Sequence, residues 1–167
     1  TLDAVVEHLE QAGYSWEIVV VDDGSVDRTA QMARDKLAGR PGRVLENERN
    51  GGKGASIKRG MLAARGRYCL FADADNSTPI QQVDKLLAAI ERHNADIAIG
   101  SRAAAGASLE KRQPFYREAM GRIFNLIVQL LVLPGIHDTQ CGFKLFTREA
   151  AQYVFKRQTY EGFSFDV

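Results

Sequence analysis

The sequence predicts an α/β fold in which a mostly parallel sheet is flanked by helices, giving three layers. Short apolar runs alternate with amphipathic segments of helical period over residues 2–100. Two of those runs lead directly into acidic residues, in EIVVVDDGS and RYCLFADAD. Because open sheets of this class bind ligands at the carboxyl ends of their strands, these acidic residues mark the predicted site.

The first part of the chain predicts a helix, a strand and a second helix. Residues 2–12 carry apolar side chains at helical spacing, and Gly13 ends that helix. Residues 18–21 are continuously apolar and β-branched, as in a strand covered on both faces. We expect Ser25 to cap the next helix, with Asp27 in its first turn. The buried stripe of that helix comprises Ala30, Ala33 and Leu37.

The alternation continues through residue 100. A short strand near Val44 and Leu45 precedes the loop NERNGGKGAS, and a helix follows over about 55–64. Residues 68–72 predict the third strand and residues 96–100 the fourth. Between these two strands, apolar residues at 80, 83, 86, 87 and 90 predict an amphipathic helix.

The last third has a different pattern. Residues 103–113 predict a loop, and residues 115–133 a long helix whose polar residues form one narrow stripe. Its wide apolar face suits either the core or a membrane surface, and both interpretations stay open. The segment DTQCGFKLF predicts a turn that feeds a short strand.

Composition indicates one globular domain, because 167 residues with 45% hydrophobic content bury one substantial core. The 22 basic and 21 acidic residues leave a net charge of +1, which gives no support to nucleic-acid binding. With only Cys69 and Cys141, the sequence predicts unpaired cysteines and a reducing compartment. No apolar run approaches the ~20 residues of a membrane-spanning helix.

Four carboxylates, those of Asp22, Asp23, Asp73 and Asp75, follow the two predicted strands. Carboxylates that converge on one crevice repel one another unless a cation or a hydrogen-bonded ligand compensates. Asp73 and Asp75 can reach one hard cation from a single turn. Acidic residues are also common in loops after strands, but two clusters on neighbouring strand ends favour a metal-dependent site.

Basic residues accompany the acidic clusters. The loop at residues 51–54 offers backbone N–H groups and Lys53 to a phosphate, although a flexible turn would need no ligand. It departs from the Walker pattern, because a glycine rather than Ser or Thr follows Lys53. Arg102, Lys111, Arg112 and Arg117 form a basic group suited to phosphate, for which a solvated face is the alternative, and Lys144 is similarly placed.

Longer segments carry a family resemblance: EIVVVDDGSVDRT, NGGKGASIKRGMLAARGRYCLFADAD, IAIGSR, and HDTQCGFKLFTREAA with a terminal FSFDV. They resemble the family 2 glycosyltransferases of the GT-A fold, closest to the dolichyl-phosphate β-glucosyltransferase branch. The DDGS and DAD elements are shared with dolichyl-phosphate mannose synthases, whereas DTQCGFKLFTR is narrower. The resemblance implies a Rossmann-like nucleotide-sugar-binding sheet, with residues 1–167 as one catalytic domain. Relatives begin with one more strand, in the middle of the sheet, and continue past FDV, so we expect this domain to be incomplete at both ends.

The resemblance also implies an activity and a site. Glucose would pass with inversion from UDP-glucose to dolichyl or another polyprenyl phosphate, at a membrane surface and without nucleic acid as a partner. The catalytic domain would face the cytoplasm, at the endoplasmic reticulum of a eukaryote or the plasma membrane of a prokaryote. The implied roles are as follows: Asp22, Asp23 (the stronger candidate), Lys53 and Asp73 bind the nucleotide sugar; Asp73 and Asp75 bind Mg²⁺ or Mn²⁺; Arg102, Arg117 and Lys144 bind the acceptor phosphate; Asp75 and Arg102 are catalytic.

Two other classes of protein share parts of this pattern. A receiver domain of phosphotransfer signalling carries an acidic pair and a third aspartate, roles open to Asp22, Asp23 and Asp73, with Ser101 as switch hydroxyl. A haloacid-dehalogenase-like phosphatase uses an Asp-x-Asp turn after a strand. The first interpretation leaves residues 114–167 unassigned, and the second leaves DDGS and DTQCGFK unused.

Overall fold

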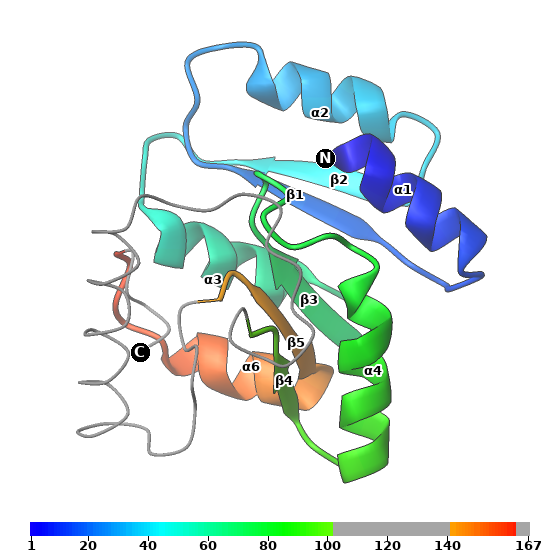
Figure 1. The fold of residues 1–167 in the computed structure, drawn as a ribbon. Helices are drawn as coiled ribbons and strands as arrows, with labels where there is room; N and C mark the ends of the chain where they lie inside the picture. Colours follow the sequence, from blue (N-terminus) through cyan, green and yellow to red (C-terminus); the bar gives the residue numbers. More distant parts are fainter. Residues whose placement is uncertain (102–140, 163–167) are drawn as a thin grey trace, which may run out of the picture.

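The computed structural model describes residues 1–101 and 141–162, in which strands alternate with helices (Figure 1). The strands are β1 (Ile18–Asp22), β2 (Gly42–Glu46), β3 (Tyr68–Ala72), β4 (Ile97–Ile99) and β5 (Phe143–Thr147). The helices are α1 (Leu2–Gln11), α2 (Thr29–Leu37), α3 (Lys53–Ala63), α4 (Gln82–His93) and α6 (Arg148–Arg157). The predicted order of elements is therefore confirmed through β4, and β5 is the short strand predicted within DTQCGFKLF. The helix predicted at 115–133 lies outside the described residues.

β1 and β2 form a parallel pair along their whole length. Helix α2 connects them and covers them with Ala30, Ala33 and Leu37, which are buried as predicted. Gly42 allows β2 to lie close to this helix, because a Cβ there would be 2.9 Å from Leu37 Cδ2. This unit has the parallel strand-helix-strand geometry that the alternation predicts.

The second sheet has the order β3-β5-β4, with β5 antiparallel to both neighbours. β3 and β4 consequently run in the same direction, and the predicted α/β class with mostly parallel strands is confirmed. A strictly parallel sheet, which the alternation favoured, is wrong for β5. The parallel prediction rests on short helical crossovers between successive strands, whereas β5 follows β4 only after the segment 102–140.

Both faces of the second sheet are covered (Figure 1). Helix α4 packs against Phe143 and Leu145 on one face. Helices α3 and α6 pack on the other face, where Phe71 and Phe146 meet Phe155 of α6. β5 contributes to both cores and its residues from Phe143 to Phe146 are buried, as expected of a central strand.

Helix α3 holds the two sheets together. Gly60 brings it close to β1, because a Cβ at that position would lie 3.1 Å from Val21 Cγ2. Met61 packs in the opposite direction, against Cys69 and Phe71 of β3. No strand ladder joins β1 to β3 within the described residues. The extra strand that the resemblance places in the middle of the sheet stays a prediction.

Two local features differ from the sequence predictions. Ser25 does not cap α2, which begins at Thr29 without a side-chain cap. The reason is that the N–H of Ser25 is bound by Asp22 in a tight turn, while Asp27 accepts the N–H of Thr29 at 2.9 Å. Helix α6 was not predicted, although its signal is present: Thr147 Oγ1 accepts the N–H of Ala150 at 3.3 Å, an N-cap.

Two further predictions concern the chain as a whole. Cys69 and Cys141 are buried and form no disulfide bond with each other, in agreement with the sequence prediction. Among the helices in the described ranges, none is both long and apolar enough to cross a membrane.

Candidate functional site

The candidate site lies where β1 and β3 end. Asp23 and Asp73 each follow directly on one of these strands. Residues 51–54, called the glycine loop below, include the first two residues of α3 and lie between the two acidic residues. The first two residues of the loop donate N–H groups to Asp23, and Lys53 pairs with Asp73. The structure therefore joins the two predicted acidic clusters through a single loop.

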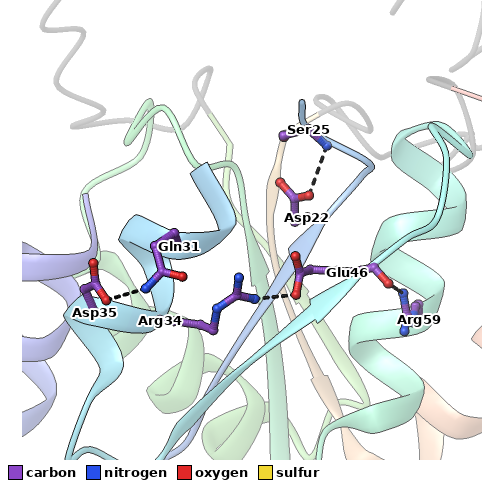
Figure 2. Close-up of polar contacts among 7 residues, drawn as sticks. All are labelled: Asp22, Ser25, Gln31, Arg34, Asp35, Glu46 and Arg59. Atoms are coloured by element: carbon purple, nitrogen blue, oxygen red, sulfur yellow. Dashed lines mark hydrogen bonds and ion pairs between the residues drawn. The ribbon is translucent and has the colours of Figure 1, made fainter. Parts of the chain in front are cut away.

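Asp22 is the last residue of β1 and is only 5% exposed. Its Oδ2 accepts the N–H of Ser25 at 3.0 Å, a contact that Figure 2 shows beyond the end of the strand. Its Oδ1 is buried and has no hydrogen-bond partner among the described residues. Because a buried carboxylate oxygen without a donor is costly, Asp22 has one acceptor position suited to a donor from a ligand.

Asp23 uses both carboxylate oxygens to hold the glycine loop. Its Oδ1 accepts the N–H of Gly51 at 2.9 Å and the side-chain amide of Asn47 at 2.7 Å. Its Oδ2 accepts the N–H of Gly52 at 2.9 Å. Burial opposes ionisation, but the hydrogen bonds from Gly51, Asn47, Ser56 and Gly52 outweigh it and lower the pKa of Asp23. The family resemblance implied a ligand-binding role for Asp23, whereas the hydrogen bonds of Asp23 described here are with the protein itself.

A second network fixes Asn47 at the end of β2. Arg59 of α3 donates to the carbonyl of Glu46 at 2.6 Å and also to Asn47 Oδ1. Figure 2 shows the same Glu46 paired through its side chain with Arg34 of α2, in which Gln31 and Asp35 are bonded to each other. Since Oδ1 of Asn47 faces an arginine, its Nδ2 must face Asp23, which settles the amide orientation.

Asp73 is held from two sides. Its Oδ1 lies 2.8 Å from Lys53 Nζ, and the two side chains are 35% and 27% exposed. Its backbone N–H donates to the carbonyl of Gly142 at 3.0 Å. A Cβ at position 142 would lie 1.9 Å from Asp73 Oδ2, so this arrangement requires a glycine.

Asp75 is exposed in the same turn. Its Oδ1 accepts the N–H of Ser77 at 2.9 Å. Hydrogen bonds from the side chain and backbone of Ser77, together with the charge of Lys53, outweigh burial and lower the pKa of Asp75. The carboxylate is consequently ionised at neutral pH.

The donor set of this turn suits a cation that is shared with phosphates. Mg²⁺ takes one or two protein carboxylates and completes its octahedron with waters and substrate phosphate oxygens. Asp73 and Asp75 provide two carboxylates from one turn. In the part of the chain that the structure describes, no group of three or more His, Cys, Asp or Glu could form an all-protein cage.

Lys144 lies in the central strand β5, opposite Phe71 of β3 and Ile99 of β4. It is 4% exposed, and its Nζ lies 5.6 Å from the centroid of the Phe71 ring. The alternative of a solvated basic face is therefore wrong for Lys144. Arg102 and Arg117 lie outside the described residues, so the grouping of these three cations stays a prediction.

Sequence reasoning missed two neighbours of the site. Gly142 is one, although its place immediately before a strand was a usable signal. Residues 158–162 are the other: the carbonyl of Glu161 accepts the N–H of Gly54 at 2.9 Å. A backbone contact of this kind has no signature in residue type, so the sequence offers nothing that predicts it.

The chain was compared with known families and proteins. A family model described as "Glycosyl transferase family 2" matches residues 1–155. Relatives named dolichyl-phosphate β-glucosyltransferase share 40% identity with the chain in Dictyostelium discoideum, 41% in Drosophila melanogaster and 36% in Homo sapiens. These alignments cover 92%, 99% and 99% of this chain and 49%, 55% and 55% of the respective relatives. The chain thus spans about half the length of the curated relatives it matches.

A solved structure supports the fold. TarS from S. aureus (residues 1–349) matches with a TM-score of 0.56 at 19% identity, over 88% of this chain and 43% of TarS. At that identity the likeness concerns the fold alone, and it agrees with the α/β arrangement of strands and helices described above.

Proposed function

The chain belongs to glycosyltransferase family 2, and on that premise we propose that it transfers glucose from UDP-glucose to dolichyl or another polyprenyl phosphate. The names of relatives at 36%, 40% and 41% identity support this sugar and this acceptor. The product is a β-linked lipid-phosphate glucose, formed with inversion at the anomeric carbon.

The observation that carries the proposal is the glycine loop between the two acidic clusters. Its N–H groups hold Asp23 and its Lys53 holds Asp73, so both strand ends face one short loop. Ligands of open α/β sheets bind at this edge. A nucleoside diphosphate has a base and ribose with hydrogen-bond donors at one end and two phosphates at the other. The acidic end of β1 matches the nucleoside, and the end that contains Lys53 matches the phosphates.

We assign the direct nucleoside contact to Asp22. Asp23 was the stronger candidate from the sequence, but both of its oxygens already accept protein hydrogen bonds. Asp22 keeps a buried Oδ1 without a described partner. An N–H or O–H of uridine would satisfy that oxygen, and Asp23 would act by holding the loop beside it.

The diphosphate end uses Lys53, Asp73 and Asp75. Lys53 supplies a cation beside Asp73, at 2.8 Å in the structure. We propose that Asp73 and Asp75 hold Mg²⁺ or Mn²⁺, with Asp75 as the catalytic carboxylate. When bound, such an ion would stabilise the charge that develops on the UDP leaving group.

The acceptor phosphate is already an anion at neutral pH, because the second pKa of a phosphate monoester is about 6. Such a nucleophile needs positioning more than deprotonation, and proximity can supply several kcal/mol. We propose that Arg102, Arg117 and Lys144 orient it. The position of Lys144 in the central strand supports this role, because it lies opposite Phe71 of β3, two residues before Asp73.

A polyprenyl acceptor implies a membrane surface, and we propose that the domain works on its cytoplasmic side. The helix that the sequence predicts at residues 115–133 would present the wide apolar face that such contact requires. The compartment follows from the cell type: endoplasmic reticulum in a eukaryote, plasma membrane in a prokaryote.

The family assignment displaces the receiver and phosphatase interpretations. The matched range, residues 1–155, includes DDGS, which the phosphatase interpretation leaves unused, and DTQCGFK, which neither interpretation uses. No feature of the described site favours either of them.

The test is a transfer assay of the full chain with a panel of sugar nucleotides and a polyprenyl phosphate. We expect glucose transfer from UDP-glucose, dependent on Mg²⁺ or Mn²⁺. Transfer of mannose from GDP-mannose instead would place the protein with the mannose synthases and refute the donor assignment.

An Arg102→Ala variant should weaken use of the lipid phosphate more than binding of UDP. Equal loss of both would refute the acceptor role.

A further inference from the structure

We infer that residues 158–162, here called the strap, hold the glycine loop in its donor-binding geometry, and that Gln158 is the positioning residue. This inference rests on the proposed function, because the geometry in question is that of the nucleotide-sugar site. It adds a residue to that site which touches neither acidic cluster.

The strap forms hydrogen bonds with both the carbonyl and the N–H of Gly54. Gln158 Nε2 donates to the carbonyl of Gly54 at 3.0 Å, and the N–H of Gly54 donates to the carbonyl of Glu161 at 2.9 Å. The same Nε2 donates to the carbonyl of Tyr160 at 2.8 Å, which folds the strap on itself. Since both neighbours of Nε2 are carbonyl oxygens, only the amide nitrogen can face them.

A third bond ties the strap to α3. Lys58 Nζ donates to the carbonyl of Gln158 at 2.6 Å. The backbone of Gly52 also lies so close that a Cβ there would be 2.7 Å from the carbonyl oxygen of Glu161. The strap therefore touches the glycine loop on both sides of Lys53.

The strap has a rigid attachment. It follows α6, whose Ala151 and Phe155 are 0% and 2% exposed. The Phe155 ring packs edge-on against Phe146 of the central strand, with ring centroids 5.4 Å apart. Because α6 is fixed in the core, the strap that follows it is held in place and can limit the movement of the glycine loop.

The consequence for the site follows from chain connectivity. Gly54 is the neighbour of Lys53, whose Nζ pairs with Asp73 at 2.8 Å. On the other side of Lys53, Gly52 donates to Asp23. A loop released from the strap would move both contacts together, whereas neither contact depends on Gln158 directly. Gln158 thus acts through the loop, which makes it a positioning residue and not a catalytic one.

The test compares Gln158→Ala with Gln152→Ala. Gln152 is a matched control because it lies in α6, which packs against α3. Its Nε2 donates a hydrogen bond to the carbonyl of Leu62 in α3 at 3.4 Å. It does not contact the glycine loop. A second variant, Lys58→Met, removes the bond to the carbonyl of Gln158 while keeping the apolar stem.

Two readouts on the full chain decide the question. Amide hydrogen exchange at Gly54, measured without substrate, should be about tenfold faster in Gln158→Ala and unchanged in Gln152→Ala. In the transfer assay, KM for UDP-glucose should rise about tenfold in Gln158→Ala, with KM for the polyprenyl phosphate unchanged. Lys58→Met should change both quantities in the same direction by a smaller factor.

The outcomes separate this inference from the proposed function. Equal Gly54 exchange in both glutamine variants, or equal loss of activity in both, would overturn the role of Gln158. If the wild-type chain transfers no glucose, the proposed function fails. The exchange comparison still decides whether the strap holds the loop.

Discussion

Replacing Gly142 by alanine should inactivate the site by moving Asp73. The Cβ of an alanine would lie 1.9 Å from Asp73 Oδ2, 2.4 Å from Cγ and 2.8 Å from Oδ1, so rotation of the carboxylate does not relieve the clash. Ordinary contacts of a Cβ begin near 3.4 Å, so Oδ2 must move by about 1.5 Å. Misplacement of a reacting group by about 1 Å can cost about 100-fold, and we expect a loss of that size in kcat/KM for UDP-glucose.

The assay measures kcat/KM and thermal unfolding for Gly142→Ala beside Gly100→Ala. Gly100 is a matched control because it also binds β5 at this edge, donating its N–H to the carbonyl of Phe143 at 2.8 Å. A Cβ at Gly100 would approach Cys141 Sγ and the carbonyl oxygen of Phe143 at 3.2 Å, and not Asp73. We expect Gly100→Ala to keep most of the donor-site activity.

A double-mutant cycle gives the refuting result. In an Asp73→Ala background the carboxylate that clashes is absent, so adding Gly142→Ala should lower activity much less than it does in the wild type. Full additivity of the two substitutions would show that Gly142 acts by another route. The reasoning from the 1.9 Å contact would then be refuted.

Three further predictions concern the loop and the acidic clusters. Asp75→Asn should lower kcat by about 100-fold or more without changing thermal unfolding, because an amide oxygen can still accept the N–H of Ser77; unchanged turnover would refute the metal assignment. Gly52→Ala should destabilise the fold by about 1–3 kcal/mol in thermal melts, because φ is +91° and Glu161 lies close; Gly51→Ala, whose nearest contact would be 3.4 Å, should not. Asp23→Asn should cost about 2 kcal/mol in urea unfolding at neutral pH. Since the folded pKa of Asp23 is lowered, the stability that it provides is present above the ordinary value of 3.8 and is lost as pH falls through the folded value; a difference that persists in acid would contradict this account.

Local patterns predicted most elements of the fold, because the spacing of apolar residues within a helix or strand indicates which of its side chains are buried. The strand at 68–72 was predicted with its observed bounds, since five apolar or aromatic residues between a charged turn and an acidic turn leave little choice. The stripe Ala30, Ala33 and Leu37 was buried as its spacing requires. The direction of β5 was not predictable, because strand direction depends on the connection and not on the pattern of the strand.

The sequence predicted which acidic residues lie at the candidate site, but it did not predict the contacts that these residues make. Strand ends and turn chemistry placed Asp22, Asp23, Asp73 and Asp75 at one edge, as the topology of open sheets requires. The sequence did not predict that Asp23 would bind protein N–H groups, because a glycine loop is equally suited to a phosphate and to a carboxylate. The folded chain brings the Asp23 carboxylate within hydrogen-bonding distance of the glycine loop, and this proximity cannot be read from residue types.

The structure also changes the argument for a cation. Four converging carboxylates suggested that a metal ion must offset their repulsion, but the chain already supplies part of the compensation. Gly51, Gly52, Asn47 and Ser56 donate hydrogen bonds to Asp23, and Lys53 forms an ion pair with Asp73. The proposal of a metal therefore rests on the two carboxylates that Asp73 and Asp75 offer from one turn, and not on the count of charges. Because Asp73 is shared with Lys53 while Asp75 is exposed and ionised, we expect the proposed cation to depend on Asp75 more than on Asp73.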